Sequence, residues 1–219
     1  MKVIALGGSV LFGDFDIKRI KSFAQVINRY NDRLAIVVGG GKIARKYIEA
    51  ARSLGADEVT CDTIGIDVTR INAAVLATSL DNAPLTVPEN FFQAKELLER
   101  YKRIVMGGTF PGHTTDATSA LLAEFLRAEE LLIATSADGV YTKDPGIYSD
   151  AERIEKMSPD ELVEIVSKNS IRAGSSSVVD LLASKIIQRS KIKTKIFFGT
   201  PHNLERALKG ENVGTLVSY

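Results

Sequence analysis

The sequence predicts an α/β protein whose mostly parallel sheet is covered by helices on both faces. Short apolar runs alternate along the 219 residues with longer segments in which apolar side chains recur every three or four positions. The short runs are apolar throughout, as in strands that are buried on both sides. Turn signals at Asp138-Gly139 and at 144–146 flank residues 140–142 and predict a small hairpin, so we expect a mixed sheet in the second half.

The expected elements follow one another along the whole chain. Strands are predicted at 2–6, 34–38, 85–87, 104–106, 131–134 and 195–198, with a last short strand near the C-terminus. Helices are predicted at 16–30, 43–53, 62–79, 91–100, from 116 onwards, and at 159–167, 178–189 and 202–209. We expect one domain of two lobes, about 1–128 and about 129–219, that meet near residues 127–131.

Three glycine-rich turns each follow a predicted strand and precede a predicted helix. They lie at Gly7-Gly8-Ser9, at 39–42 and at 107–112. Because parallel strands end at one edge of a sheet, we expect the three turns to be neighbours. Amides at such turns and at helix N-termini bind anions, and several together would suit a nucleoside triphosphate and a phosphorylated acceptor. Glycines at strand ends also serve simply as turn formers, and Thr115 or Asp116 would cap the following helix in either case.

Two common nucleotide-binding motifs, the Walker A loop and the dinucleotide fingerprint, do not account for all three glycine turns. A Walker A loop is absent, because Ile36 stands where its first glycine belongs and Ile43 where a serine or threonine should follow the lysine. Residues 39–44 do satisfy the dinucleotide fingerprint G-x-G-x-x-A, and a dinucleotide-binding protein is therefore kept as an alternative. That alternative leaves the turns at 7–9 and 107–112 unexplained.

Composition excludes several classes of function. The net charge of +1 provides no electrostatic footprint for nucleic acid, and no apolar run reaches membrane-spanning length. Cys61 is the only cysteine, which excludes a disulfide framework within the chain and favours a cytoplasmic location. With one cysteine and two histidines, we expect no metal site built from protein ligands of these types.

Five motifs, in order and in spacing, resemble the archaeal-type uridylate kinases of the amino-acid-kinase superfamily. They are LGGSVL at 6–11, VVGGGKIARKYIE at 37–49, MGGTFPGHTTDA at 106–117, ATSADGVYTKDP at 134–145 and AGSSSVVDLLASKI at 173–186. The resemblance covers essentially the whole chain and implies a three-layer αβα sandwich. It also implies transfer of the γ-phosphoryl of ATP, with Mg²⁺, to UMP, and a homohexamer built as a trimer of dimers. The acceptor site would lie in the N-terminal lobe and the ATP site in the C-terminal lobe.

Carried over by position, the resemblance implies an ATP site made of Gly7, Gly8, Ser9, Val10, Gly41, Arg45, Thr135, Tyr141 and Asp144. The ring of Tyr141 would lie against the base, and Asp144 would accept a hydrogen bond from the ribose. The residues alone leave other roles open. Arg45 would equally be a solvated charge on a helix, and Tyr141 and Asp144 would equally belong to the hairpin and to its proline turn.

The implied UMP site is made of Gly40, Asp62, Phe110, Pro111, Gly112, His113, Thr114, Thr115 and Asp116. Asp62 would accept hydrogen bonds from the ribose, although its position also suggests the N-cap of the helix predicted at 62–79. Thr114 and Thr115 would bind the phosphate or the base. His113 is expected to be a loop or pocket residue, because a phosphate monoester with a second pKa of about 6 needs no catalytic base.

Catalytic roles are expected for Lys42, Asp116 and Lys185. Many members of the superfamily carry a lysine where this chain has Ala5, and we hypothesise that Lys42 supplies the missing positive charge. Asp116 would orient the basic groups around the phosphoryl, and Lys185 would neutralise its charge unless it is an ordinary solvent-exposed lysine. A kinase for a carboxylate or an isoprenoid phosphate, and a nucleotide sensor without activity, remain alternatives.

Overall fold

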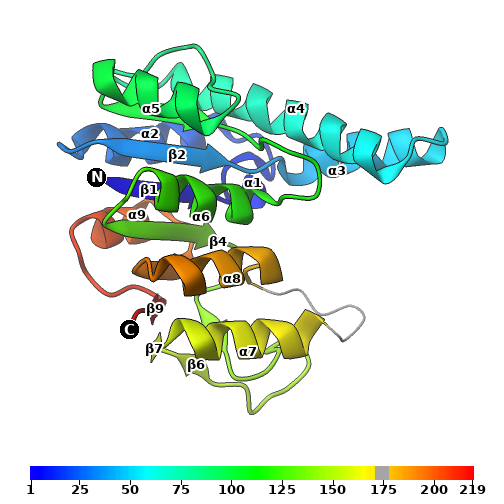
Figure 1. The fold of residues 1–219 in the computed structure, drawn as a ribbon, viewed down its shortest axis with the longest axis vertical. Helices are drawn as coiled ribbons and strands as arrows, with labels where there is room; N and C mark the ends of the chain where they lie inside the picture. The colour runs from blue at the N-terminus through cyan, green and yellow to red at the C-terminus, as the bar shows by residue number, and fades with distance from the viewer. Residues whose placement is uncertain (171–177) are drawn as a thin grey trace.

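A seven-stranded sheet forms the centre of the protein, with the strand order β3-β2-β1-β4-β8-β9-β7 (Figure 1). The computed structural model describes residues 1–170 and 178–219, so residues 173–177 of the last sequence motif lie outside it. All neighbouring strands are parallel except β8 and β9, which makes the sheet mixed, as predicted. The strands are β1 (Lys2–Leu6), β2 (Leu34–Val38), β3 (Arg103–Met106), β4 (Glu130–Thr135), β7 (Lys156–Met157), β8 (Thr194–Phe198) and β9 (Thr215–Val217).

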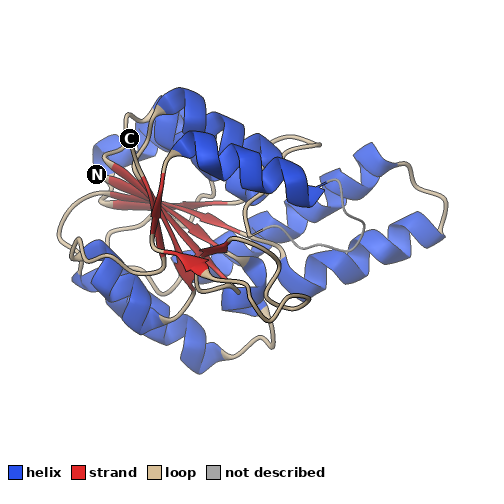
Figure 2. Cartoon of the chain, turned by 90° about the horizontal axis from the view of Figure 1, so that it is seen from below, coloured by secondary structure: helices blue, strands red, loops and turns tan. Residues whose placement is uncertain are grey.

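Helices cover both faces of the sheet, which confirms the predicted three-layer arrangement (Figure 2). Successive side chains along a strand point to opposite faces, so Val3 and Ala5 of β1 belong to one apolar cluster while Ile4 and Leu6 belong to the other. The described helices are α1 (Gly8–Phe12), α2 (Ile17–Arg29), α3 (Gly41–Ser53), α4 (Glu58–Ala77), α5 (Phe91–Arg100), α6 (Thr115–Phe125), α7 (Pro159–Ser170), α8 (Leu181–Ser190) and α9 (Pro201–Leu208). Helices α5, α6, α7 and α8 contribute to the first cluster, and α1, α2, α4 and α9 to the second.

Several boundaries differ from the prediction for local reasons. Helix α4 begins at Glu58 rather than at Asp62, because the Asp57 side chain accepts from the Thr60 amide and caps the helix earlier. Residues 85–87 form no strand, and α1 follows the first glycine turn without a loop.

The second half contains two short strands that were not predicted. The expected hairpin is present as a separate two-stranded antiparallel sheet, in which β5 (Val140–Tyr141) pairs with β6 (Arg153–Ile154). Strands β6 and β7 were missed, since each is only two residues long and carries little periodicity.

The sheet is continuous across the predicted junction between the lobes, because β1 pairs with β2 on one side and with β4 on the other. Helices α3 and α4 form a pair that extends beyond the carboxyl ends of the strands (Figure 1). The division into lobes stays a prediction, but this edge is where the glycine turns lie. Among the described residues, no helix has the length and apolar character that crossing a membrane requires.

Candidate active site

The first two glycine turns lie against each other where β1 and β2 end. A Cβ added at Gly8 would lie 2.1 Å from the Gly41 nitrogen, so only glycine permits this contact. Gly40 has a right-handed helical backbone (φ −80°, ψ −26°), whereas Gly41 is left-handed (φ +65°). Consecutive residues in these two conformations point their amides towards one place and form an anion-binding nest. Because α3 begins at this nest, the helix dipole adds to its attraction for a phosphate.

Helix α4 holds both the second and the third glycine turn. The Asn72 side-chain amide donates to the carbonyl oxygens of Gly39 (3.0 Å) and Gly40 (3.3 Å). Nearby on the same helix, Thr69 Oγ1 accepts from the Gly108 amide at 2.7 Å. Both side chains are buried. The three turns therefore share one edge of the sheet, as predicted, and α4 fixes two of them relative to each other.

Residues 109–113 form a loop that leads from β3 towards α6 and contacts α4. Gly112, which is left-handed (φ +81°), donates its amide to Asp62 Oδ2 at 2.7 Å. The suggestion that Asp62 is the N-cap of α4 is wrong, because Asp57 occupies that position. Asp62 instead lies within the helix and contacts the loop, so the structure brings it together with part of the predicted UMP site.

Aromatic side chains gather at the tip of this loop. The Phe110 ring lies 5.9 Å from the His113 ring, and the Phe110 side chain is exposed. Both residues line an apolar groove of about 450 Å³ that continues over α5 and α6. His113 Nδ1 is buried and has no hydrogen-bond partner among the described residues. His113 is thus a loop residue that lines a groove, as the sequence predicted.

Asp116 lies in the first turn of α6 and is partly buried. Burial of the carboxyl group raises its pKa to about 7, and the negative charge of Asp180 contributes to the rise. The N-cap of α6 is Thr114, rather than Thr115 or Asp116, since Thr114 Oγ1 accepts from the Ala117 amide at 3.0 Å. Asp116 therefore has no capping role, and its charge changes close to neutral pH.

Residues 7–10 lie beside the ends of two further strands. The Gly7 amide donates to the Ala134 carbonyl oxygen at 2.9 Å, which joins the turn to β4. Val10 packs so closely on Gly199, just after β8, that a Cβ added at Gly199 would lie 2.4 Å from its methyl carbon. The ends of β1, β4 and β8 therefore meet here, and Gly199 is a contact that the sequence did not reveal.

The remaining residues of the predicted ATP site lie at the end of β4 and in the segment after it. Thr135 is its last residue, and Tyr141 lies in β5 with its hydroxyl donating to Asp138 Oδ1 at 2.9 Å. Asp144 Oδ1 accepts from the Gly146 amide at 2.8 Å, so Asp144 forms the turn that the sequence suggested. The geometry thus confirms the hairpin and turn roles, and contact of these residues with ATP stays a prediction.

The predicted cationic residues are exposed side chains. Lys42 Nζ forms an ion pair with Asp14 Oδ1 at 2.9 Å, and the two side chains are 59% and 87% exposed. Arg45 on α3 and Lys185 on α8 are exposed, and neither forms an ion pair within residues 1–170 and 178–219. Their positive charges are therefore free to meet a ligand, and their catalytic roles stay predictions.

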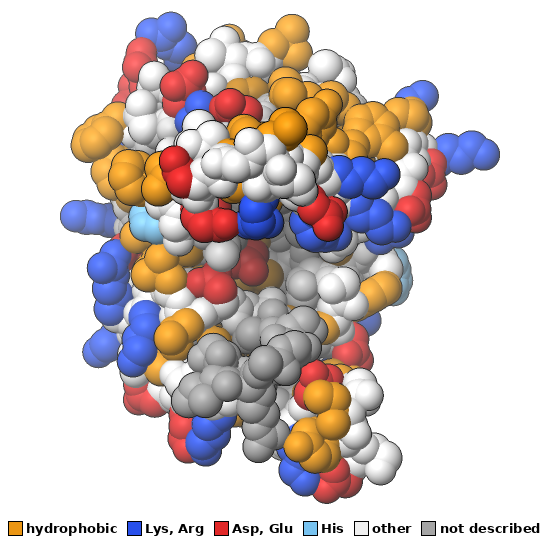
Figure 3. Space-filling model, turned by 90° about the vertical axis from the view of Figure 1, so that its right-hand side faces the viewer, with side chains coloured by type: hydrophobic (Ala, Val, Ile, Leu, Met, Phe, Trp, Pro, Cys, Tyr) orange, Lys and Arg blue, Asp and Glu red, His pale blue; other side chains and the backbone are white. Residues whose placement is uncertain are grey.

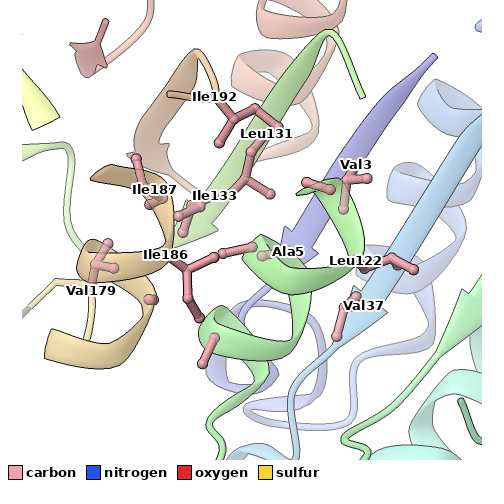
Figure 4. Packing of buried hydrophobic residues seen from close by; sticks show 14 of the residues in the cluster. Val3, Ala5, Val37, Leu122, Leu131, Ile133, Val179, Ile186, Ile187 and Ile192 are labelled. Carbon is pink, nitrogen blue, oxygen red and sulfur yellow. The ribbon is translucent and has the colours of Figure 1, made fainter. Parts of the chain in front are cut away.

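Ala5, which stands where many superfamily members have lysine, is only 2% exposed. It lies within the apolar cluster that also contains Ile133 of β4 and Ile186 of α8 (Figure 4). An alanine side chain carries no charge and is too short to reach beyond this cluster. The position cannot supply a cation in this chain, which is the premise of the Lys42 hypothesis.

Figure 3 views the molecule from the edge where the glycine turns lie and shows a hollow with charged side chains of both signs above it. No group of three or more histidine, cysteine, aspartate or glutamate side chains in the described part of the chain is placed to hold a metal ion. The nest at Gly40–Gly41 and the N-terminus of α3 make this edge suited to anions.

Besides Gly199, three residues of this edge were missed by sequence reasoning: Thr69, Asn72 and Asp180. A signal existed for each of them. Thr69 and Asn72 are polar residues on the otherwise apolar buried face of α4. Asp180 precedes the amphipathic run 181–187, which is the pattern of a helix N-cap.

Comparisons with known proteins agree with this geometry. The model of the amino acid kinase family matches residues 1–197. The chain is 51% identical to the uridylate kinase of Archaeoglobus fulgidus over 99% of both chains, and 49% identical to that of Methanocaldococcus jannaschii over 98% of both. The crystal structure of the Archaeoglobus fulgidus enzyme superimposes with a TM-score of 0.92, at 50% identity and full coverage of both chains.

A more distant solved structure, the UMP kinase of Bacillus anthracis, has a TM-score of 0.81 at 27% identity and covers 99% of this chain and 95% of its own. The similarity therefore extends over the whole sheet and both helical layers. The chain belongs to the amino acid kinase family, and within it to the group that contains the archaeal uridylate kinases.

Proposed function

We propose that the protein is a UMP kinase, which transfers the γ-phosphoryl group of ATP to UMP and releases UDP and ADP. The observation that carries the proposal is the contact between Gly8 and the nest at Gly40–Gly41, with the Gly112–Asp62 loop held at the same edge. Two phosphorylated ligands bound at this edge would have their phosphates next to each other. Close alignment and positive charge are the main requirements for phosphoryl transfer.

In this proposal the two ligands occupy opposite sides of the nest. UMP lies against the 110–115 loop, with its ribose on Asp62 and its phosphate near Gly40. ATP lies over residues 7–10 and follows β4 towards Tyr141 and Asp144. The acceptor phosphate already carries an ionised oxygen at neutral pH, so His113 has no proton to remove.

Positive charge at the transferring oxygens comes from Lys42 and Lys185, and the amides of Gly41 and Ser9 add hydrogen bonds. Asp116 carries the same sign as the phosphoryl group and cannot stabilise it directly. It acts instead by orienting the two lysines, which requires its ionised form. Arg45 then adds a contact to the outer phosphates of ATP.

The described residues contain no cluster able to cage a metal ion by themselves. That arrangement fits Mg²⁺, which usually keeps water ligands and is bound largely through substrate phosphates. Mg²⁺ would enter with ATP and neutralise part of the charge on its phosphates.

A homohexamer and a cytoplasmic location complete the proposal. An apolar surface on α5 and α6 supports assembly, because the Phe92 side chain is 76% exposed and lies 5.2 Å, ring to ring, from Phe125. Sedimentation equilibrium of the unmodified protein measures the assembled mass, and a monomer at micromolar concentration would contradict the hexamer.

The proposed activity is tested by measuring ADP release with UMP, CMP, dUMP, carbamate and N-acetylglutamate in parallel. We expect release with UMP at a rate well above that with carbamate or N-acetylglutamate, and the rates with CMP and dUMP measure how strictly the base and the ribose are recognised. Release with carbamate or N-acetylglutamate alone would indicate a carboxylate kinase. Binding of ATP without any acceptor-dependent release would indicate a nucleotide sensor.

A further inference from the structure

The N-termini of α6 and α8 are joined by one side-chain contact. Thr114 Oγ1 donates to Asp180 Oδ2 at 2.5 Å, across 66 residues of sequence. Each residue is also the N-cap of its own helix. Thr114 accepts from the Ala117 amide at 3.0 Å, and Asp180 accepts from the Ala183 amide at 2.9 Å through its other oxygen, Oδ1.

The contact with Asp180 uses the only proton of the Thr114 hydroxyl group. A hydroxyl has one proton, so Thr114 cannot donate to a ligand while it donates to Asp180. Thr115 is the first residue of α6, and within residues 1–170 and 178–219 its hydroxyl group makes no hydrogen bond, so it is available to the acceptor. The contact gives Thr114 a role in the fold besides its predicted hydrogen bond to UMP, which stays a prediction.

The two helices that meet here carry different parts of the proposed active site. Helix α6 continues from the loop at 109–113, and Asp116 lies in its first turn. Helix α8 carries Lys185 and packs along α6 within one apolar cluster. A hydrogen bond between their N-cap residues therefore fixes the acceptor loop relative to the helix that carries Lys185.

We propose that Asp180 is a positioning residue, which accepts from Thr114 and so holds the acceptor loop in line with the phosphoryl donor. This inference rests on the proposed kinase function. Phosphoryl transfer depends on alignment, and displacements of about 1 Å can cost about a hundredfold in rate. Losing the contact should therefore lower kcat more than it raises the KM for either nucleotide.

An exchange of the two side chains tests the proposal. Threonine and aspartate are both good N-caps, so Thr114→Asp, Asp180→Thr and the double exchange all keep both helices capped. Thr114→Asp alone sets two carboxylates against each other, and kcat should fall at least thirtyfold. Asp180→Thr alone leaves a weaker neutral contact, and kcat should fall about tenfold.

The double exchange restores a charge-assisted hydrogen bond in the reverse direction, so its kcat should be clearly higher than the product of the two single losses would give. Urea midpoints within error of the parent would show that all three variants are folded. Near-parental kcat in all three variants would overturn the proposal, since the residues would then be caps only. A loss in the double exchange equal to the product of the single losses would also overturn it, because the charge would be needed at position 180 itself.

The parent protein separates this inference from the proposed function. If the parent releases no ADP with UMP, the kinase proposal fails. If the unmodified protein is active but the effects of the two single exchanges on kcat simply multiply in the double exchange, only the positioning role fails.

Discussion

Gly112 and Asp62, fifty residues apart, are joined by a hydrogen bond of 2.7 Å from the Gly112 amide to Asp62 Oδ2. The bond uses one carboxylate oxygen and leaves the other for a ligand. A helix residue thereby holds a loop in place and can also present a charged acceptor to a sugar hydroxyl.

Replacing Asp62 by alanine should raise the KM for UMP at least tenfold, because the loop loses its anchor and the ribose its acceptor. The KM for ATP should change less than twofold. Thr63→Ala is the matched control, since Thr63 is exposed on the same helix and its hydroxyl donates to the Val59 carbonyl oxygen within that helix. Initial-rate kinetics with each nucleotide varied in turn would measure both values, and an equal rise in both would contradict a specific role in the acceptor site.

Replacing Lys42 by methionine should lower kcat more than tenfold, because Ala5 cannot supply the positive charge. Stability should hardly change, since the ion pair with Asp14 is exposed to solvent and such pairs contribute little. Asp14→Asn removes the pair but keeps the lysine, and it should turn over at close to the parental rate. A loss of less than tenfold in the Lys42 variant would discard the hypothesis.

Replacing Asp116 by asparagine should leave binding of both nucleotides within about threefold and reduce turnover by at least a hundredfold. The reason is that an uncharged amide cannot orient the two lysines. Isothermal titration calorimetry measures the two affinities, and single-turnover kinetics measure the chemical step. A large loss of UMP affinity with little change in turnover would instead place Asp116 in binding.

The same residue predicts how stability depends on pH. The pKa of Asp116 is about 7 when folded and close to 3.8 when unfolded, so between these values the folded state holds more protons. The contribution of this group to stability therefore falls as pH rises from about 4 to about 7, and is flat above that. In the parent this fall amounts to about 3 kcal/mol between about pH 5 and about pH 8, and in Asp116→Asn it should be absent. Urea unfolding of both proteins at the two pH values measures the difference, and parallel pH dependence would contradict the raised pKa.

Arg103 should matter for stability rather than activity. Its side chain is 4% exposed and donates to the backbone carbonyl oxygens of Ile27, Asn28, Tyr30 and Asp81. Arg103→Met leaves these acceptors without a partner and should cost about 3 kcal/mol. Arg100→Met, at an exposed position on α5, should cost less than about 0.5 kcal/mol in the same urea unfolding experiment.

The sequence alone determined the layer architecture and the place of the site. Apolar runs such as 34–38 and 131–134 are buried on both faces, and that condition produces a helix-covered, mostly parallel sheet. The three glycine turns could be assigned to one edge because parallel strands end together. Local periodicity and turn chemistry carry this information in short stretches of sequence.

Only the tertiary structure decided which side chains meet at that edge. The contacts of Asp62 with Gly112, of Thr69 with Gly108 and of Thr114 with Asp180 join residues that are between 39 and 66 positions apart. No local pattern specifies such pairs, because they depend on how whole helices pack on the sheet. For the same reason the sequence suggested Asp62 as the cap of α4, which is Asp57 in the structure, and it gave no sign of the hydrogen bond between Thr114 and Asp180.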